Sequence, residues 1–218
     1  MIRDLTDAMQ DYLKEIHKLR MEGRRATTSA IAERMGVRPP SVTAMLKRLS
    51  AVGLAEHAPY KGVELTPAGE RVALEVIRHH RLLEQYLAQA LGLSLDEVHS
   101  EADRLEHALS EELEARIDQS LGFPTHDPHG DPIPDADLRI DRARLRTLAS
   151  LEPGDEATIR RVPDGDDELL RYLKKLALIP GKKVKLRAAE PFGGPLTVRV
   201  GKADHAISRE LASGIGVA

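Results

Sequence analysis

Two carboxylates and an imidazole lie close together in the segment 103–107 (DRLEH). We predict a helix over residues 100–117, on which positions i, i+3 and i+4 share one face. Asp103, Glu106 and His107 would then converge at one point. Oxygen and nitrogen donors of this kind suit divalent Mn, Fe, Co, Ni or Zn. The segment is therefore a candidate metal site.

Further candidate ligands lie on neighbouring predicted elements. His80 and Glu84 form an i, i+4 pair on the preceding helix, and His99 lies just before the acidic helix. Asp11 lies on the first helix, where packing against the other helices could bring it close. Ordinary roles compete with these: Asp103 could belong to a helix capping box, and His80 with Glu84 could be a simple charge pair. The residues alone leave both interpretations open.

Hydrophobic periodicity predicts the elements that must position these side chains. We expect helices over 4–22, 30–35, 39–53, 67–91 and 100–117, a short capped turn at 94–97, and a hairpin over 54–66 that turns at Lys61-Gly62. The Pro-rich residues 119–137 are interpreted as a linker. Strands over 157–162, 183–188 and 196–200, with a helix over 168–178, then predict a small β-rich domain. The expected fold class is mainly α with a small β domain, divided at 1–66, 67–140 and 148–218.

The first 66 residues have the element order of a winged helix-turn-helix DNA-binding domain: helix, short helix, Gly-centred turn, helix, hairpin. The third helix would enter the major groove, where Arg reaches guanine edges or phosphates and Ala or a Thr methyl contacts thymine methyls. The helix-turn-helix is also used for protein contacts, and exposed polar residues on a small helical domain are common. The candidate DNA-binding residues are Thr27, Thr28, Arg38, Pro40, Ser41, Thr43, Ala44, Lys47, Arg48 and Lys61.

Composition narrows the function classes. The chain lacks Cys, which excludes disulfides, zinc–thiolate sites and cysteine catalysis. Neither a run of about 18 apolar residues nor a signal-peptide pattern occurs, so we expect a cytoplasmic protein. Phosphate-loop, Gly-x-Ser-x-Gly and His-Glu-x-x-His motifs are missing, which argues against an enzyme. The aromatic content of 3% argues against an apolar ligand pocket or a groove for Pro-rich peptides. Residues 94–143 hold four Lys/Arg and fourteen Asp/Glu, which suits cation binding.

The chain resembles the diphtheria-toxin-repressor and manganese-transport-regulator family of metal-dependent transcriptional repressors. The matching motifs stand in order over residues 1–140, and the tail resembles the SH3-like domain that is also found in ferrous-transport accessory proteins. The motifs are Asp-Tyr-Leu at 11–13, Ile-Ala-Glu-Arg at 31–34, Pro-Ser-Val-Thr at 40–43, Leu-Thr-Pro-Ala-Gly at 65–69, Arg-His-His-Arg-Leu-Leu-Glu at 78–84, DRLEH at 103–107 and, in the tail, LRYLKKLALIPG at 170–181.

This resemblance implies a homodimer, a divalent metal corepressor and double-stranded operator DNA as partners. It implies a primary metal site at Asp11, Asp103, Glu106 and His107. It also implies a second site at His80, Glu84 and His99, with Asp166 of the tail as the best acidic candidate. A turn and helix N-cap is the competing interpretation of Asp166, and in manganese-type members the residue matching His80 joins the main cluster.

Two departures from the family pattern bear on the metal. Iron-type members place a Met and a Cys at the positions of Asp11 and Asp103, and carboxylates are harder ligands that favour Mn(II), with Fe(II) as the alternative. Short manganese-type members place a Glu at the position of Lys14. Because a charged Lys cannot be a ligand, their two-metal cluster is not expected here. The resemblance therefore implies a manganese-dependent repressor of metal uptake genes.

Overall fold

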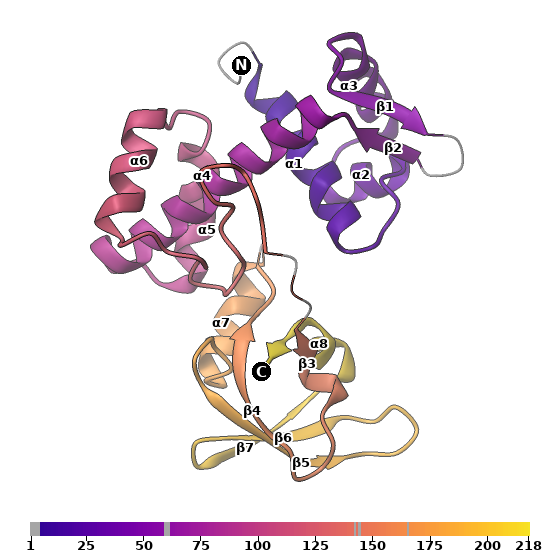
Figure 1. The fold of residues 1–218 in the computed structure, drawn as a ribbon. Coiled ribbons are helices and arrows are strands. Elements are labelled where there is room, and N and C mark those ends of the chain that lie inside the picture. The colour runs from indigo at the N-terminus through magenta and orange to yellow at the C-terminus, as the bar shows by residue number, and fades with distance from the viewer. Residues whose placement is uncertain (1–4, 59–61, 142, 144, 165) are drawn as a thin grey trace. The chain divides into compact units, whose positions relative to one another are not determined.

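The computed structural model describes residues 5–58, 62–141, 143, 145–164 and 166–218 (Figure 1). It divides into two compact units. The first contains Met1–His80, Glu106–Leu109 and Pro134–Arg139, and the second contains Arg81–Leu105, Ser110–Ile133 and Ile140–Ala218. No helix in the described ranges has the length and apolar character that crossing a membrane requires.

Three helices and a hairpin form the start of the first unit (Figure 1). They are α1 (Asp7–Met21), α2 (Thr28–Arg34), α3 (Pro39–Ala51) and the antiparallel strands β1 (Ala55–Ala58) and β2 (Gly62–Leu65). The hydroxyl of Thr6 caps α1, that of Thr27 caps α2, and the two prolines begin α3. Fully buried Leu13, Ile16, Ile31, Val42 and Leu49 join the three helices in one core. The predicted helix-turn-helix and hairpin are thus present.

A long helix, α4 (Pro67–Leu91), follows the hairpin and matches its predicted bounds. The Thr66 hydroxyl accepts a hydrogen bond of 3.1 Å from the Gly69 amide, so it caps the helix. A Cβ at Gly69 would lie 1.9 Å from the Leu54 carbonyl oxygen, which explains why glycine stands at this position. α4 therefore begins in close contact with the hairpin.

The single helix expected over 100–117 is wrong. The structure has α5 (Leu95–Leu105) and α6 (Glu111–Ser120), separated by a turn. The Ser94 amide donates to Glu97 Oε2 at 2.9 Å, so the predicted capping box begins a full helix rather than a short turn. Ser110 then caps α6. Glu106 and His107 consequently lie in the turn after α5, while Asp103 lies on α5 itself.

The centre of the Pro-rich segment is held by specific hydrogen bonds and is partly buried, so its interpretation as a linker is wrong. Asp127 Oδ1 accepts from the amides of His129 and Asp131, both at 2.9 Å, and closes a tight turn. The Arg81 guanidinium donates to the Pro132 carbonyl at 2.5 Å. Asp127 and His129 are buried. An α4 side chain and a local Asx turn therefore hold the part of this segment after α6, where the described residues form no helix or named strand.

The tail forms a small β domain within the second unit (Figure 1). Its six-stranded sheet has the order β3-β8-β4-β5-β6-β7, and it also carries α7 (Asp167–Lys175), α8 (Arg209–Gly214) and a 3-10 turn (Leu148–Ser150). The strands are β3 (Arg146–Thr147), β4 (Glu156–Arg161), β5 (Lys183–Ala189), β6 (Leu196–Val200), β7 (Ala203–Ile207) and β8 (Gly216–Val217). The predicted strands correspond to β4, β5 and β6, and the sequence analysis missed β3, β7, β8 and α8. α7 packs against α5.

Candidate metal centre

Asp11, Glu106 and His107 form a compact group in the first unit. One ligand atom from each lies within 4.8 Å of the others. Asp11 Oδ1 is 3.0 Å from His107 Nε2, and Glu106 Oε1 is 3.5 Å from the same nitrogen. Glu106 is buried, and the other two are partly buried. The structure thus brings together three of the four residues assigned to the primary site.

Neighbouring side chains hold this group in place. Gln10 Oε1 is 2.9 Å from His107 Nδ1, so that a proton on Nδ1 leaves Nε2 as the atom that faces Asp11. His80 Nδ1 lies 2.5 Å from Glu106 Oε2. The hydrogen bond with Asp11 raises the pKa of His107, burial opposes the rise, and the negative charge of Glu106 adds to it. These contacts give two carboxylates and an imidazole an arrangement suited to a divalent cation.

One cation is already present at this group. Lys14 Nζ lies 2.6 Å from Glu106 Oε1, and the two side chains are 7% and 0% exposed. The distance is that of a charge-assisted hydrogen bond. The oxygen that would serve a metal is therefore occupied by an ammonium group.

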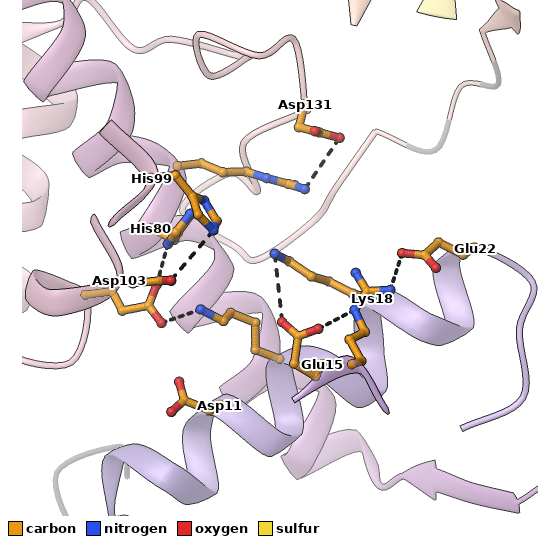
Figure 2. A network of polar contacts seen from close by, with 12 residues as sticks. Asp11, Glu15, Lys18, Glu22, His80, His99, Asp103 and Asp131 are labelled. Atoms are coloured by element: carbon orange, nitrogen blue, oxygen red, sulfur yellow. Dashed lines mark hydrogen bonds and ion pairs between the residues drawn. The ribbon is translucent and has the colours of Figure 1, made fainter. Parts of the chain in front are cut away.

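Asp103, the fourth assigned ligand, lies on α5 in the second unit, and its side chain is 46% exposed. Its Oδ2 is 3.6 Å from His99 Nε2 (Figure 2), and His99 Nδ1 is 3.1 Å from Glu84 Oε1. The predicted association of His99 with Glu84 is thus present in the structure, and the role of Asp103 as a ligand stays a prediction.

Glu84 also belongs to a buried group that the sequence analysis missed. Glu84, Asp127 and His129 each offer a ligand atom within 4.8 Å of the others, and all three are buried. The Asp-x-His spacing at 127–129 was the available signal. The interpretation of 119–137 as a linker hid this signal, because a linker does not hold ligands in place.

The chemistry of this second group fits a cation. Asp127 Oδ2 and His129 Nδ1 have no hydrogen-bond partner within the described ranges, which is rare for buried polar atoms. Burial raises the pKa of Asp127 well above 3.8, and the charge of Glu84 adds to the rise. Burial lowers the pKa of His129, but its ion pair with Glu84 at 3.6 Å outweighs this and raises that pKa to about 9. Among the described residues, both atoms have only ion pairs at 3.6 Å, Asp127 with Arg81 and His129 with Glu84, and a divalent ion would give them a closer partner.

Asp166, the tail candidate, is exposed at the start of α7. Its Oδ1 accepts from the amides of Glu168 and Leu169, both at 3.0 Å. This is the N-cap role that the sequence analysis set beside the ligand role. The N-cap fully explains this carboxylate, and a ligand role stays a prediction.

The candidate DNA-binding residues are mostly displayed on α3. Arg38, Pro40, Ser41, Thr43, Ala44, Lys47 and Arg48 are all exposed. Thr28 is partly exposed at the start of α2, whereas the Thr27 hydroxyl caps that helix by accepting from the Ala30 amide at 3.1 Å. Lys61 lies outside the described residues. The exposed face of α3 therefore offers cations and hydroxyls to an anionic partner.

A winged helix, an oxygen- and nitrogen-rich metal group and an SH3-like tail together define a metal-dependent DNA-binding regulator. Comparison with known families agrees. Residues 4–63 match "Iron dependent repressor, N-terminal DNA binding domain", residues 66–135 match "Iron dependent repressor, metal binding and dimerisation domain", and residues 146–218 match "FeoA domain". The fold class predicted from the sequence is confirmed.

Individual relatives identify the family. The chain is 33% identical over 228 residues to the iron-dependent repressor IdeR of Mycobacterium tuberculosis, covering 99% of both chains. It is 38% identical over 144 residues to the diphtheria toxin repressor of Corynebacterium efficiens, covering 66% of this chain and 63% of the relative. The chain belongs to this family of metal-dependent transcriptional repressors, as the resemblance predicted, and the family's members are not enzymes.

Solved structures extend the comparison to manganese regulators. A structure described as a manganese-dependent transcriptional repressor in complex with manganese has a TM-score of 0.88 and 38% identity, covering 96% of this chain and 98% of that chain. The manganese regulator SloR has a TM-score of 0.82 and 31% identity, covering 96% and 97%. Iron and manganese regulators thus both stand among the similar proteins, and a divalent metal is the shared cofactor.

Proposed function

We propose that this protein is a manganese(II)-dependent repressor that binds operator DNA as a homodimer and controls metal uptake genes. Access to that DNA would place it in the cytoplasm. The observation that carries the proposal is the group of Asp11, Glu106 and His107, in which Asp11 comes from the DNA-binding domain and the other two from the turn after α5.

The ligand types support manganese over iron. The group offers two carboxylate oxygens and one imidazole nitrogen, and no thiolate donor is available because the chain lacks Cys. Hard oxygen ligands suit Mn(II), although intrinsic affinity rises from Mn(II) to Fe(II). The structural relative described in complex with manganese favours the same choice. Iron(II) is the second candidate, since the relative that matches over 99% of both chains is an iron-dependent repressor.

We assign two metal sites. The primary site would use Asp11, Glu106 and His107, joined by Asp103, with His80 holding Glu106. The second would use the buried group Glu84, Asp127 and His129, with His99 on the other oxygen of Glu84 and Asp166 as a tail candidate.

The chain's own residues explain how a metal would affect DNA binding. A bound divalent ion would compensate the repulsion between the Asp11 and Glu106 carboxylates, so that both could bind the same ion. Asp11 lies on α1, and Leu13 and Ile16 of the same helix anchor it in the core with α3. Fixing Asp11 therefore fixes the helix that would enter the major groove. Linkage then requires that DNA and metal strengthen each other's binding.

Exposed surfaces of the described residues support the proposed DNA contacts and the proposed dimer. Arg38, Lys47 and Arg48 would contact DNA from α3, with the other exposed residues of that face beside them. Leu105 and Leu113 leave 43% and 49% of their surfaces exposed within the region that matches the dimerisation domain. We propose residues 1–66 as the DNA-binding domain, 67–140 as the dimerisation and metal domain, and 148–218 as the SH3-like domain.

The test is a fluorescence-anisotropy titration with duplex DNA from the protein's own promoter region at fixed salt. It is run without metal, with Mn(II), with anaerobic Fe(II) and with Zn(II). We expect tight binding only with metal, and the tightest at physiological Mn(II). Equal binding without metal would overturn the proposal, and a response to Fe(II) alone would select the iron alternative.

A further inference from the structure

Lys14 is a buried cation inside the primary metal group. It lies three residues after Asp11 on α1, so both side chains leave the same face of that helix. Its ammonium contacts Glu106 Oε1 at 2.6 Å, and its side chain is only 7% exposed. A buried carboxylate and a buried ammonium are each costly without a partner. Lys14 and Glu106 therefore stabilise each other in the metal-free protein.

Lys14 contacts the Glu106 oxygen that faces the other residues of the primary metal group. Glu106 Oε1 is the atom that also lies 3.5 Å from His107 Nε2. The other oxygen, Oε2, is held by His80 at 2.5 Å. Neither oxygen of Glu106 is therefore available to a new cation unless a present contact is given up, and the Lys14 contact is the one that carries a full positive charge.

We infer that Lys14 is a surrogate cation whose ammonium holds Glu106 in the metal-free protein and yields Oε1 when a divalent ion binds. This inference rests on the proposed metal function and adds a residue that sets the metal concentration needed for it. Because like charges repel at short range, the ammonium weakens metal binding at this site. The same ammonium also stabilises the buried Glu106 carboxylate when no metal is bound.

The test replaces the charge and keeps the length of the side chain. Lys14→Met should lower the Kd for Mn(II) by about tenfold or more, measured by competition with a fluorescent chelator, because the repulsion is gone. The same variant should lower the melting temperature of the metal-free protein, and Mn(II) should restore it. The matched control is Lys18→Met: Lys18 lies one turn later on α1 and pairs with Glu15 at 3.9 Å (Figure 2), outside the metal group. It should leave the Kd unchanged.

A second measurement uses the wild-type protein, so it does not depend on folding of the variant. Amine acylation is followed by peptide mass spectrometry, with Lys18 as the internal reference. Mn(II) should raise the labelling rate of Lys14 several-fold because the ammonium is released. An unchanged Kd in a folded Lys14→Met protein, or an unchanged labelling rate, would overturn the inference. If the wild type binds no Mn(II) at all, the proposed function itself fails, so the two failures are distinguishable.

Discussion

The protonation of His129 provides the most direct test of the electrostatics in the second metal group. Its pKa in the folded protein is about 9, against an ordinary value of 6.5. A group whose pKa is raised by folding stabilises the folded state fully below pH 6.5, and that stabilisation is lost as the pH rises through 9. At about 1.4 kcal/mol per pKa unit, the loss is about 3 kcal/mol.

Asp127 contributes in the same direction. Its pKa is raised well above 3.8 by burial, so its stabilising effect is lost from acidic pH upward through that raised pKa. The contribution of His129 is therefore taken from the difference between wild type and a His129 variant at pH 6.5 and 9.5. His129→Gln removes the titrating group and should flatten the dependence of the unfolding free energy on pH. The variant should be less stable than wild type at pH 6.5 and about equally stable at pH 9.5.

The assay is urea denaturation of chelator-treated protein, followed by helix circular dichroism, together with NMR titration of the histidine side chains. His126→Gln is the control, since His126 is an exposed histidine in the same segment. Saturating Mn(II) should suppress the pH dependence of the wild type, because a metal ligand must be neutral imidazole. Titration of His129 near pH 6.5, or the same pH profile in wild type and His129→Gln, would refute this reasoning.

Three further predictions concern the primary site, the DNA and the Pro-rich segment. His107→Gln should weaken metal-dependent DNA binding at least about tenfold in the anisotropy assay while the circular dichroism spectrum stays native, and an undiminished metal response would contradict the site. Arg38→Ala should reduce the salt slope of DNA binding by about 1, and an unchanged slope would exclude a phosphate contact. Gly130→Ala places a Cβ 1.8 Å from the Arg160 carbonyl oxygen and should cost about 1–3 kcal/mol by thermal denaturation. The control Gly154→Ala meets nothing within 4 Å at a similarly positive φ, so an equal loss there would show that backbone strain alone is responsible.

Local signals in the sequence were sufficient for much of the fold. Thr66 and Pro67 mark the start of α4 and Gly92 follows its end, so both bounds were predictable. The same is true of α3, which begins at its proline pair. In each case a cap or breaker coincides with a change in hydrophobic period, and no distant contact was needed to place the helix end.

The break between α5 and α6 was not predictable from periodicity. Leu105, Leu109 and Leu113 continue the apolar spacing across the turn, so the pattern suggests one helix. Ser110 followed by two glutamates is a helix start signal inside that pattern. The cap at Ser110, and not the apolar spacing, determines where α6 begins.

The second metal group escaped prediction for a different reason. Proline content correctly indicated the lack of regular structure, but order in that segment comes from distant partners. Arg81 holds the Pro132 carbonyl, and the Val162 amide donates to the His129 carbonyl at 2.9 Å. Such contacts join residues that are far apart in the chain, and no local pattern encodes them. The grouping of Glu106 and His107, by contrast, was predictable because they are adjacent in the chain, and Asp11 lies on a helix with strong signals; that these residues bind a metal stays a prediction.

The hydrogen bond from the Val162 amide to the His129 carbonyl means that the tail helps to position a residue of the second site. Residues 146–218 provide that amide and the close contact at Gly130. A lineage that lost the tail would therefore lose selection on the second site as well. We expect tail-less descendants to retain Asp11 and His107 while the positions of Asp127 and His129 drift to unrelated residue types, and a sequence comparison across such lineages would show whether the two losses go together.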